Sequence, residues 1–132
     1  MKKEIFQEIC SQVFSTLEIK EQLTIYLEGE SSQYFRFNDS KLRQSGIIED
    51  YAVTISLFKG KKSLQAATTV SLDIESSVNN LRNEIHALRD PLSLIPKNEF
   101  TSFPDSFESV EMIKSGQLPD RNEILEALMD VI

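Results

Sequence analysis

The sequence predicts an α+β fold, in which an antiparallel β-sheet built from hairpins carries helices packed on it. Apolar and polar residues alternate from Tyr51 to Phe58, which is typical of a strand with one buried face. Lys59-Gly60-Lys61 then favours a tight hairpin turn, and Lys62 to Val70 is predicted to be the return strand. A stripe at helical spacing follows and predicts a helix that lays one face on the sheet: Ile74, Val78, Leu81, Ile85 and Leu88.

The part of the chain before Tyr51 predicts a helix and further strands. Residues 3–18 have the apolar spacing of an amphipathic helix, with Ile5, Phe6, Ile9, Val13 and Leu17 on one side. Leu23 to Leu27 is a predicted strand, which we expect Glu28-Gly29-Glu30-Ser31-Ser32 to close.

A second short strand is then expected over Gln33 to Phe37, and Asn38-Asp39-Ser40 has the composition of a turn. The strand pattern continues beyond that turn from Lys41 to Ile48, with Gly46 as a bulge or bend.

The part after the sheet is expected to be helical with one extended connector. Ser71 or Asp73 is the predicted cap of a helix over residues 73–90, and Pro91 is expected to end it. Residues 105–115 are predicted to form a short helix stopped by Gly116. A last helix should begin at Pro119-Asp120, where Asp120 and Glu123 have capping-box spacing.

These elements divide the chain into three regions. Residues 1–90 are the predicted α+β core, 91–104 a Pro-containing connector, and 105–132 the C-terminal helices. The sequence stops at Val131-Ile132 inside an apolar stripe and without a helix stop signal. We therefore expect the chain to be a piece of a longer protein.

Composition limits the classes of function. The net charge of −7 over 132 residues argues against binding nucleic acid, which requires a basic surface. Cys10 is the one cysteine, so no internal disulfide can form and a reducing compartment is expected. Polar residues interrupt the N-terminus, and no apolar run reaches the roughly 18 residues of a membrane span. A cytoplasmic protein with no membrane contact is predicted.

Residues that could carry chemistry are few, and no catalytic, cofactor-binding or metal-ligating residue is predicted in this chain. His86 is the only histidine and lies beside the apolar stripe of its helix, so we interpret it as a solvated residue and not as a metal ligand. Cys10 lies on the first helix without an activating pattern, which favours a buried structural thiol over a nucleophile.

Three groups with charged residues are candidates for a site. The paired acids Glu28/Glu30 and Glu49/Asp50 could do acid–base work, but charge that protects sheet edges is favoured. Lys59 to Lys62 lacks the spacing of a phosphate loop and is interpreted as a solvated hairpin tip. A third cluster resembles a stacking surface for single strands but is expected to contribute to the core: Arg36, Lys41 and Arg43 with Tyr34, Phe35 and Phe37.

Three stretches in order resemble the TldD/PmbA family over roughly residues 20–105. Tyr34 to Gly46 is similar to a family segment in which Arg-Phe and a small polar turn precede a Leu/Ile-x-Gln element. Glu49 to Lys61 resembles the strand and the basic, glycine-containing turn that come next. Ala66 to Asp73 resembles the entry to a long helix, although Ala52 and Thr54 stand where the family often has glycines.

The resemblance implies a role in peptide processing. The family is similar to zinc metallopeptidases, also called modulators of DNA gyrase, which act on peptides such as microcin precursors or antitoxins. Their zinc ligands lie in a His-Glu-x-x-x-His helix and a later cysteine, well downstream of this region. Zinc is thus expected only in the C-terminal part of an active parent, and this chain is expected to hold no cofactor. Family proteins form homodimers or heterodimers, with a peptide as substrate.

Three hypotheses remain open at this point. The chain is a non-catalytic N-terminal domain of a zinc peptidase, or the same domain of an inactive PmbA-type partner subunit, or a stand-alone α+β interaction module. In the first two, the domain would support assembly and wall the substrate chamber. Its strand edges are also suited to pair with an extended peptide.

Overall fold

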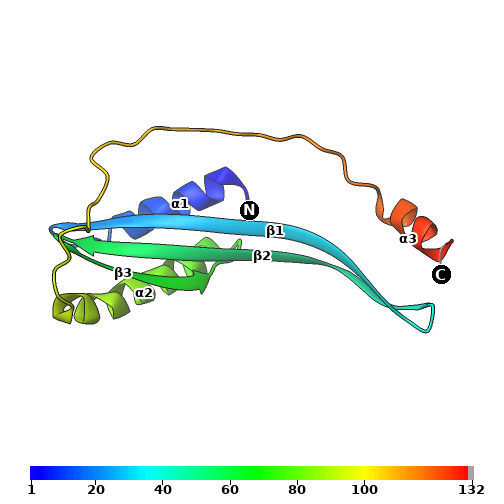
Figure 1. Cartoon of the computed structure of the whole chain (residues 1–132), viewed down its shortest axis with the longest axis horizontal. Helices are drawn as coiled ribbons and strands as arrows, with labels where there is room; N and C mark the ends of the chain where they lie inside the picture. The colour runs from blue at the N-terminus through cyan, green and yellow to red at the C-terminus, as the bar shows by residue number, and fades with distance from the viewer. Residues whose placement is uncertain (131–132) are drawn as a thin grey trace. The chain divides into compact units, whose positions relative to one another are not determined.

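The computed structural model describes residues 1–130 and has six regular elements (Figure 1). The predicted apolar end at Val131-Ile132 lies outside the described residues. In chain order the elements are α1 (Lys3–Phe14), β1 (Glu21–Asn38), β2 (Lys41–Lys59), β3 (Lys62–Thr69), α2 (Ile74–Leu94) and α3 (Arg121–Met129). The chain forms two compact units, which are Met1–Tyr34 with Gly46–Pro104, and Phe35–Ser45 with Asp105–Ile132.

The three strands form one sheet in the order β1-β2-β3, which confirms the predicted α+β class. β2 and β3 are antiparallel, and their register pairs Ile55 with Ala66 and Leu57 with Leu64. Because side chains alternate along a strand, these four residues share one face of the sheet. Val53, Ile55 and Leu57 are buried there, as the alternation of β2 predicts.

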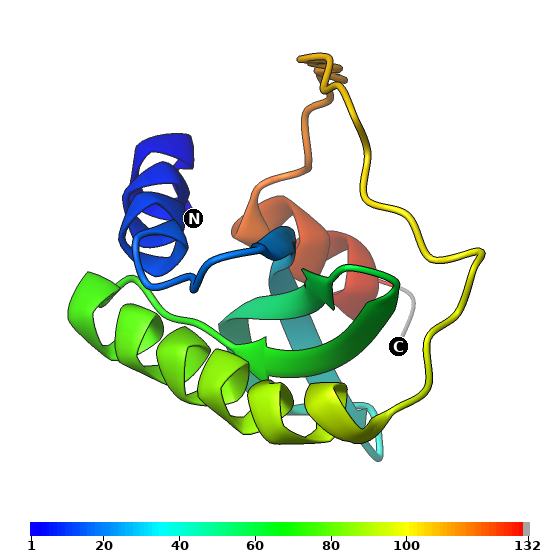
Figure 2. The ribbon, with the colours of Figure 1, turned by 90° about the vertical axis from the view of Figure 1, so that its left-hand side faces the viewer.

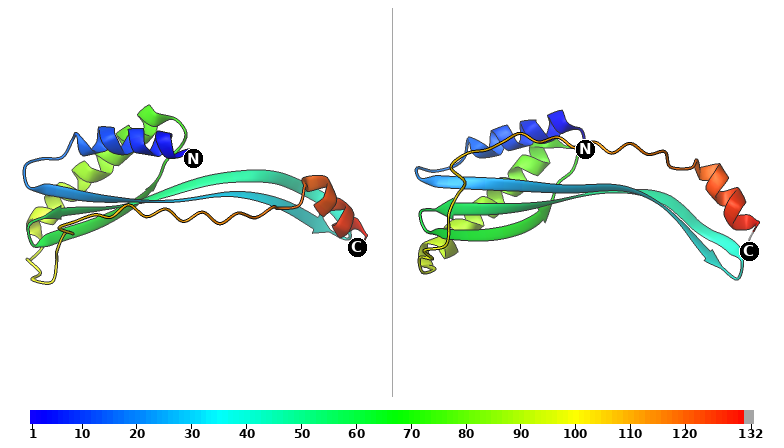
Figure 3. Two further views of the ribbon diagram at one scale, coloured as in Figure 1. Left: turned by 90° about the horizontal axis from the view of Figure 1, so that it is seen from above. Right: turned by 45° about the horizontal axis from the view of Figure 1, so that its top comes forward.

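Both long helices cover that face and leave the other without a helix in the first unit (Figure 3). α2 packs along β3, and α1 packs on α2 (Figure 2). The predicted stripe of α2 supplies Val78, Leu81 and Ile85 to the core, and α1 supplies Ile9 and Val13. Burying side chains of this size contributes roughly 1.5–3 kcal/mol each, so this interface is the main source of stability.

β1 is a single long strand, so the predicted break at Glu28 to Ser32 is wrong. Gly29 stays within the strand because the ring of Tyr51 on β2 occupies the space where its side chain would stand. β2 is also continuous, and Gly46 lies within it beneath the ring of Tyr34. Glycine therefore marks aromatic packing across the hairpin at both positions.

Both hairpin turns form where the sequence predicts them. Asp39 and Ser40 have φ values of 49° and 57°, and positive φ at both loop residues is the pattern of a type I′ turn. Between β2 and β3, Gly60 takes a φ of 62°, which a residue without Cβ adopts at little cost.

The helix after the sheet runs past Pro91, contrary to the prediction that this proline ends it. Asp73 is the N-cap, as predicted, and its carboxylate accepts from the Ser76 N–H at 3.4 Å. The additional turn buries Leu92, which is 2% exposed, against the core. We attribute the tolerated proline to that burial, which offsets the lost backbone hydrogen bond.

Helix α1 ends at Phe14 rather than continuing to residue 18. The hydroxyls of Ser15 and Thr16 donate to the carbonyls of Gln12 and Val13, each at 2.7 Å, and so terminate the helix.

The helix predicted over residues 105–115 is absent from the structure, where this segment is irregular. Val110 and Ile113 are both 81% exposed, and a helix this short is marginal without an apolar surface to bury its face. α3 does form, and Asp120 and Glu123 make the predicted capping box.

Candidate functional site

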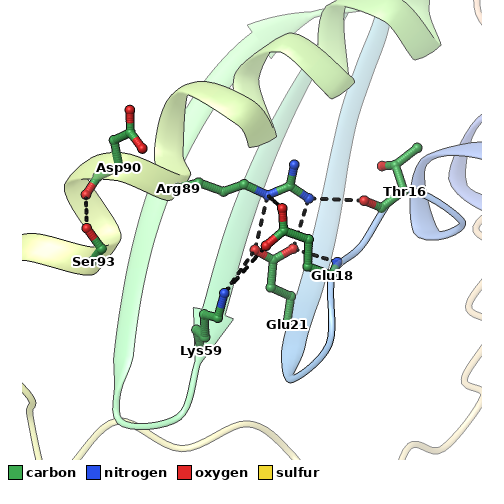
Figure 4. A network of polar contacts seen from close by, with 7 residues as sticks. All are labelled: Thr16, Glu18, Glu21, Lys59, Arg89, Asp90 and Ser93. Atoms are coloured by element: carbon green, nitrogen blue, oxygen red, sulfur yellow. Dashed lines mark hydrogen bonds and ion pairs between the residues drawn. The ribbon is translucent and has the colours of Figure 1, made fainter.

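The most organised group of polar side chains joins four segments around the start of β1 (Figure 4). The carboxylate of Glu21 accepts from Arg89 Nε at 3.1 Å and from Arg89 Nη2 at 3.0 Å. The same Nη2 donates to the carbonyl of Thr16 at 3.0 Å, after the end of α1. Arg89 thus fastens α2 to both the first strand and the loop before it.

Two further groups complete this network. The backbone N–H of Glu18 donates to Glu21 Oε2 at 2.8 Å, and Lys59 Nζ lies 3.8 Å from Glu21 Oε1. Glu18 itself lies 3.6 Å from Lys59 Nζ and 3.5 Å from Arg89 Nε, but its side chain is 56% exposed. The Glu21 side chain is 0% exposed, so it is the buried centre of the network.

The electrostatics of this network keep Glu21 ionised. Burial raises the pKa of Glu21, but the hydrogen bonds from Arg89 and the Glu18 N–H, with the charges of Arg89 and Lys59, outweigh it. The net result is a pKa below the usual 4.5. Hydrogen bonding to Glu21 likewise raises the pKa of Arg89. A carboxylate held ionised in this way is a poor proton donor or acceptor near neutral pH, so the network suits a structural role.

A cavity of about 330 Å³ opens beside the network. Its lining combines three cationic side chains and the buried carboxylate with two residues near the end of α2: Lys59, Lys62, Arg89, Glu21, Leu92 and Ser93. The cations are already engaged, since Lys62 Nζ donates to the Ser93 carbonyl at 2.7 Å.

Three of the four paired acids, Glu28, Glu30 and Asp50, line one cavity on the uncovered face of the sheet, and Glu49 does not line it. This cavity has a volume of about 420 Å³ and is also lined by Gly29 and Ala52. Glu28 accepts from the Tyr26 hydroxyl at 3.3 Å and Glu30 from the Ser32 hydroxyl at 3.1 Å. All three carboxylates are exposed. Asp50 lies just beyond the part of β2 that pairs with β3, which fits the interpretation of these acids as charge on open strand edges.

Neither His86 nor Cys10 is among the residues that line these two cavities. His86 is an exposed residue of α2, as predicted. Cys10 is a half-buried free thiol on α1, and burial raises its pKa, which disfavours the reactive thiolate. Within residues 1–130 no three His, Cys, Asp or Glu side chains are grouped so that they could hold a metal ion.

The turn from Lys59 to Lys62, predicted to be a solvated hairpin tip, also makes contacts with the connector. Lys61 accepts at its carbonyl from the Asn98 N–H at 2.9 Å, and its Nζ donates to the carbonyls of Glu99 and Thr101, each at 3.3 Å. The connector is thereby held against the β2–β3 turn. Phe103 then packs edge-on against Phe58 with ring centroids 5.2 Å apart.

The aromatic and basic cluster around the β1–β2 turn does not join the core, contrary to prediction. Phe35, Phe37 and Tyr34 are each half-buried, and Arg36, Lys41 and Arg43 are exposed. Phe35–Ser45 belongs to the second unit of the chain. Within that unit Arg121 of α3 donates to the Ser45 hydroxyl at 2.5 Å.

Sequence reasoning missed the network around Glu21. The chain places Glu21 and Arg89 far apart, and a strand that begins with glutamate has no pattern that indicates burial. The one usable signal is the position of Arg89, which follows Leu88 and comes four residues after Ile85 on the stripe of α2.

No helix within residues 1–130 is long and apolar enough to cross a membrane. No protein-family model, no curated protein and no solved structure matches the chain.

Proposed function

We propose that the chain is the N-terminal, non-catalytic domain of a TldD/PmbA-like zinc metallopeptidase that acts in cytoplasmic peptide processing or maturation. In this role it contributes to assembly with a second subunit and walls part of the substrate chamber. The proposal assigns hydrolysis and zinc binding to a downstream region of the parent protein.

One observation carries the proposal. The three stretches that resemble the family fall, in the family's order, on consecutive parts of one hairpin sheet and the helix that follows it. Tyr34 to Gly46 surrounds the β1–β2 turn, Glu49 to Lys61 forms the second half of β2 and its turn, and Ala66 to Asp73 connects β3 to the N-cap of α2. The polar turn, the glycine-containing turn and the helix entry of the family pattern each fall on a turn or a helix entry of this chain, which supports the proposal.

The polar network supports a scaffold role for this domain. Arg89 ties α2 to Glu21 at the start of β1 and to the loop after α1, and the contacts of Lys61 hold the connector at the β2–β3 turn. Within the first unit, one face of the described sheet carries no helix, and such a face is suited to pack on a neighbouring domain or subunit.

A PmbA-type partner subunit without the zinc motif is the second candidate. It is favoured by the departures from the family pattern, since Ala52 and Thr54 replace glycines in the central strand. The two forms of the proposal predict the same role for residues 1–132. They differ only in whether the downstream sequence carries the zinc motif.

The coding sequence after residue 132 tests the proposal. A downstream His-Glu-x-x-x-His with a later cysteine is the expected result for a peptidase, and family sequence without that motif is expected for the partner subunit. A stop codon directly after residue 132, or unrelated sequence there, contradicts both.

Metal analysis of the purified chain is an independent test, because the proposal assigns zinc binding elsewhere. We expect the 132-residue protein to contain less than about one tenth of an equivalent of zinc after dialysis. Stoichiometric zinc that a chelator removes would contradict the assignment. Peptidase activity of the isolated chain would contradict it as well.

A further inference from the structure

The cavity beside the Glu21 network has the size and lining of a small ligand pocket. Its volume of about 330 Å³ is at the lower end of the range for ligand pockets, roughly 300–1,000 Å³. Lys59, Lys62 and Arg89 line it together with Glu21, and Leu92 contributes an apolar side chain. All of these residues belong to the first unit of the chain. A ligand held here would be small and would meet mainly cationic groups.

The charged groups around this cavity leave a surplus of positive charge. Arg89 and Lys59 both lie beside the carboxylates of Glu21 and Glu18. The Nζ of Lys62 instead donates to a backbone carbonyl, a neutral acceptor, at 2.7 Å. Three cations against two carboxylates therefore leave one positive charge. A monoanion bound here would balance the site, whereas a dianion would reverse its charge.

The contacts within the network use only part of the donors of these cations. An arginine side chain has five N–H donors and a lysine ammonium has three. Within residues 1–130, Arg89 donates from Nε and Nη2, and its Nη1 makes no hydrogen bond (Figure 4). Lys59 Nζ lies 3.6 Å and 3.8 Å from its carboxylate partners, which is longer than a hydrogen bond, and Lys62 Nζ makes one hydrogen bond. Donors therefore remain for an acceptor from outside the chain.

The buried carboxylate of Glu21 does not prevent an anion from binding nearby. Its Oε1 accepts from Arg89 Nε at 3.1 Å, and its Oε2 accepts from Arg89 Nη2 at 3.0 Å and from the Glu18 N–H at 2.8 Å. Both oxygens are thus paired with donors inside the protein. Because Arg89 balances the charge of Glu21 in this pair, the two lysines supply the attraction for a ligand.

We propose that this cavity binds a small organic anion that carries a single carboxylate, held by Lys59, Lys62 and the Nη1 of Arg89, with a short apolar group toward Leu92. A short-chain free acid and the C-terminus of a peptide both present this chemistry. The inference goes beyond the proposed function, which assigns no ligand to this domain.

An NMR titration of the 132-residue protein with butyrate tests the inference at neutral pH and about 0.15 M salt. We expect saturable shifts of the Arg89 Nε–H signal and of the backbone amides of Lys59, Lys62 and Ser93. A dissociation constant of about 1–20 mM is expected for a ligand with so few non-hydrogen atoms. Butyramide, which has the same shape without the charge, should bind at least about tenfold more weakly. Sulfate, a dianion, should also bind more weakly than butyrate.

Two variants test the lysines that line the cavity. Lys59→Met and Lys62→Met should each weaken butyrate binding at least about fivefold, because each removes one cation from the lining. Lys41→Met is the matched control, since it makes the same change of net charge at an exposed residue at the other end of β2. It should leave the dissociation constant unchanged. Circular dichroism checks that all three variants are folded.

A peptide probe separates the two sources of the carboxylate. An N-acetylated tripeptide with a free C-terminus is compared with its C-terminal amide and with butyrate. Tighter binding of the free peptide than of butyrate identifies a peptide C-terminus as the ligand, and the reverse order identifies a free acid.

Three results would overturn the inference. The first is the absence of saturable shifts with both butyrate and the free peptide up to about 50 mM. The second is binding of butyramide or sulfate at least as tight as that of butyrate. The third is a loss of affinity in Lys41→Met equal to that in Lys59→Met and Lys62→Met, because the anion would then respond to net charge and not to this cavity.

Discussion

The ring of Tyr51 on β2 lies across Gly29 on β1, so closely that a Cβ added to Gly29 would stand 2.6 Å from Tyr51 Cδ1. Tyr34 and Gly46 repeat the arrangement with the strands exchanged, at 2.9 Å from Tyr34 Cε1. Each ring packs over the bare backbone of a glycine on the neighbouring strand. This packing explains how both strands pass through glycine without a break, since the ring supplies the contacts that the missing side chain cannot.

Gly29→Ala should destabilise the protein, although alanine is normally the better residue in a strand. The added methyl must displace the near side of a ring close to its own backbone, and overpacking of this kind costs about 1–2 kcal/mol. Urea unfolding measures the change. Gly116→Ala is the control, because a Cβ there meets no atom within 4 Å. Equal stability of the two variants would contradict the packing described.

Arg89→Ala should lower the free energy of unfolding by about 3 kcal/mol. It leaves the buried Glu21 carboxylate without its two strongest donors and frees the Thr16 carbonyl. Glu18→Ala is the matched control, since it removes an exposed carboxylate of the same network and keeps the backbone N–H that Glu21 accepts. We expect a loss below about 1 kcal/mol for that variant. A comparable loss of unfolding free energy in both variants would show that the burial of Glu21 does not set the contribution of this network to stability.

The depressed pKa of Glu21 predicts the direction of the pH dependence. When the chain unfolds, the pKa of this carboxyl returns to about its ordinary 4.5, so the unfolded state binds a proton at a higher pH than the folded state. The contribution of Glu21 to stability is therefore complete above that value and is lost as the pH falls through the folded pKa. Unfolding midpoints between pH 7 and pH 3 should fall more steeply for the wild type than for Glu21→Gln. Parallel curves would contradict the assignment.

The sequence was sufficient for the parts of the fold that follow from local periodicity. The alternation of β2, the turn at Gly60 and the stripe of α2 are each set by residues close in the chain, and the structure confirms them. The errors arose where distant contacts override local preference. The ring of Tyr51 keeps Gly29 in a strand, and no apolar surface is available to fold the segment around Val110 into a helix.

The polar network was beyond sequence reasoning for the same reason. The predictions that His86 is a solvated residue and that Cys10 is a structural thiol depend on residue type and near neighbours, which a single sequence displays. Glu21 and Arg89 become partners only when α2 is laid on the sheet, and the register of that packing is set by the core as a whole.

Pro91→Ala should stabilise the protein by about 2 kcal/mol. The proline lies inside α2, where it cannot donate to the carbonyl of Ala87 one turn earlier, and alanine restores that hydrogen bond. Leu92 and the helix-ending bond from the Ile95 N–H to the residue 91 carbonyl, at 3.1 Å, remain in place. Thermal unfolding followed by circular dichroism measures the gain. A lower melting temperature would mean that the proline fixes a bend on which the burial of Leu92 depends.

Phe103→Ala should release the connector without unfolding the core. Phe103 holds the connector through its edge-on contact with Phe58, and such pairs contribute about 1 kcal/mol beyond their buried area. Local opening should therefore increase roughly fivefold, and trypsin should cleave after Lys97 faster by the same factor. Phe100→Ala is the matched control, because Phe100 is 95% exposed. Mass spectrometry of the fragments identifies the cut. If both variants are cleaved at the wild-type rate, the hydrogen bonds of Lys61 hold the connector and the Phe58–Phe103 pair does not contribute.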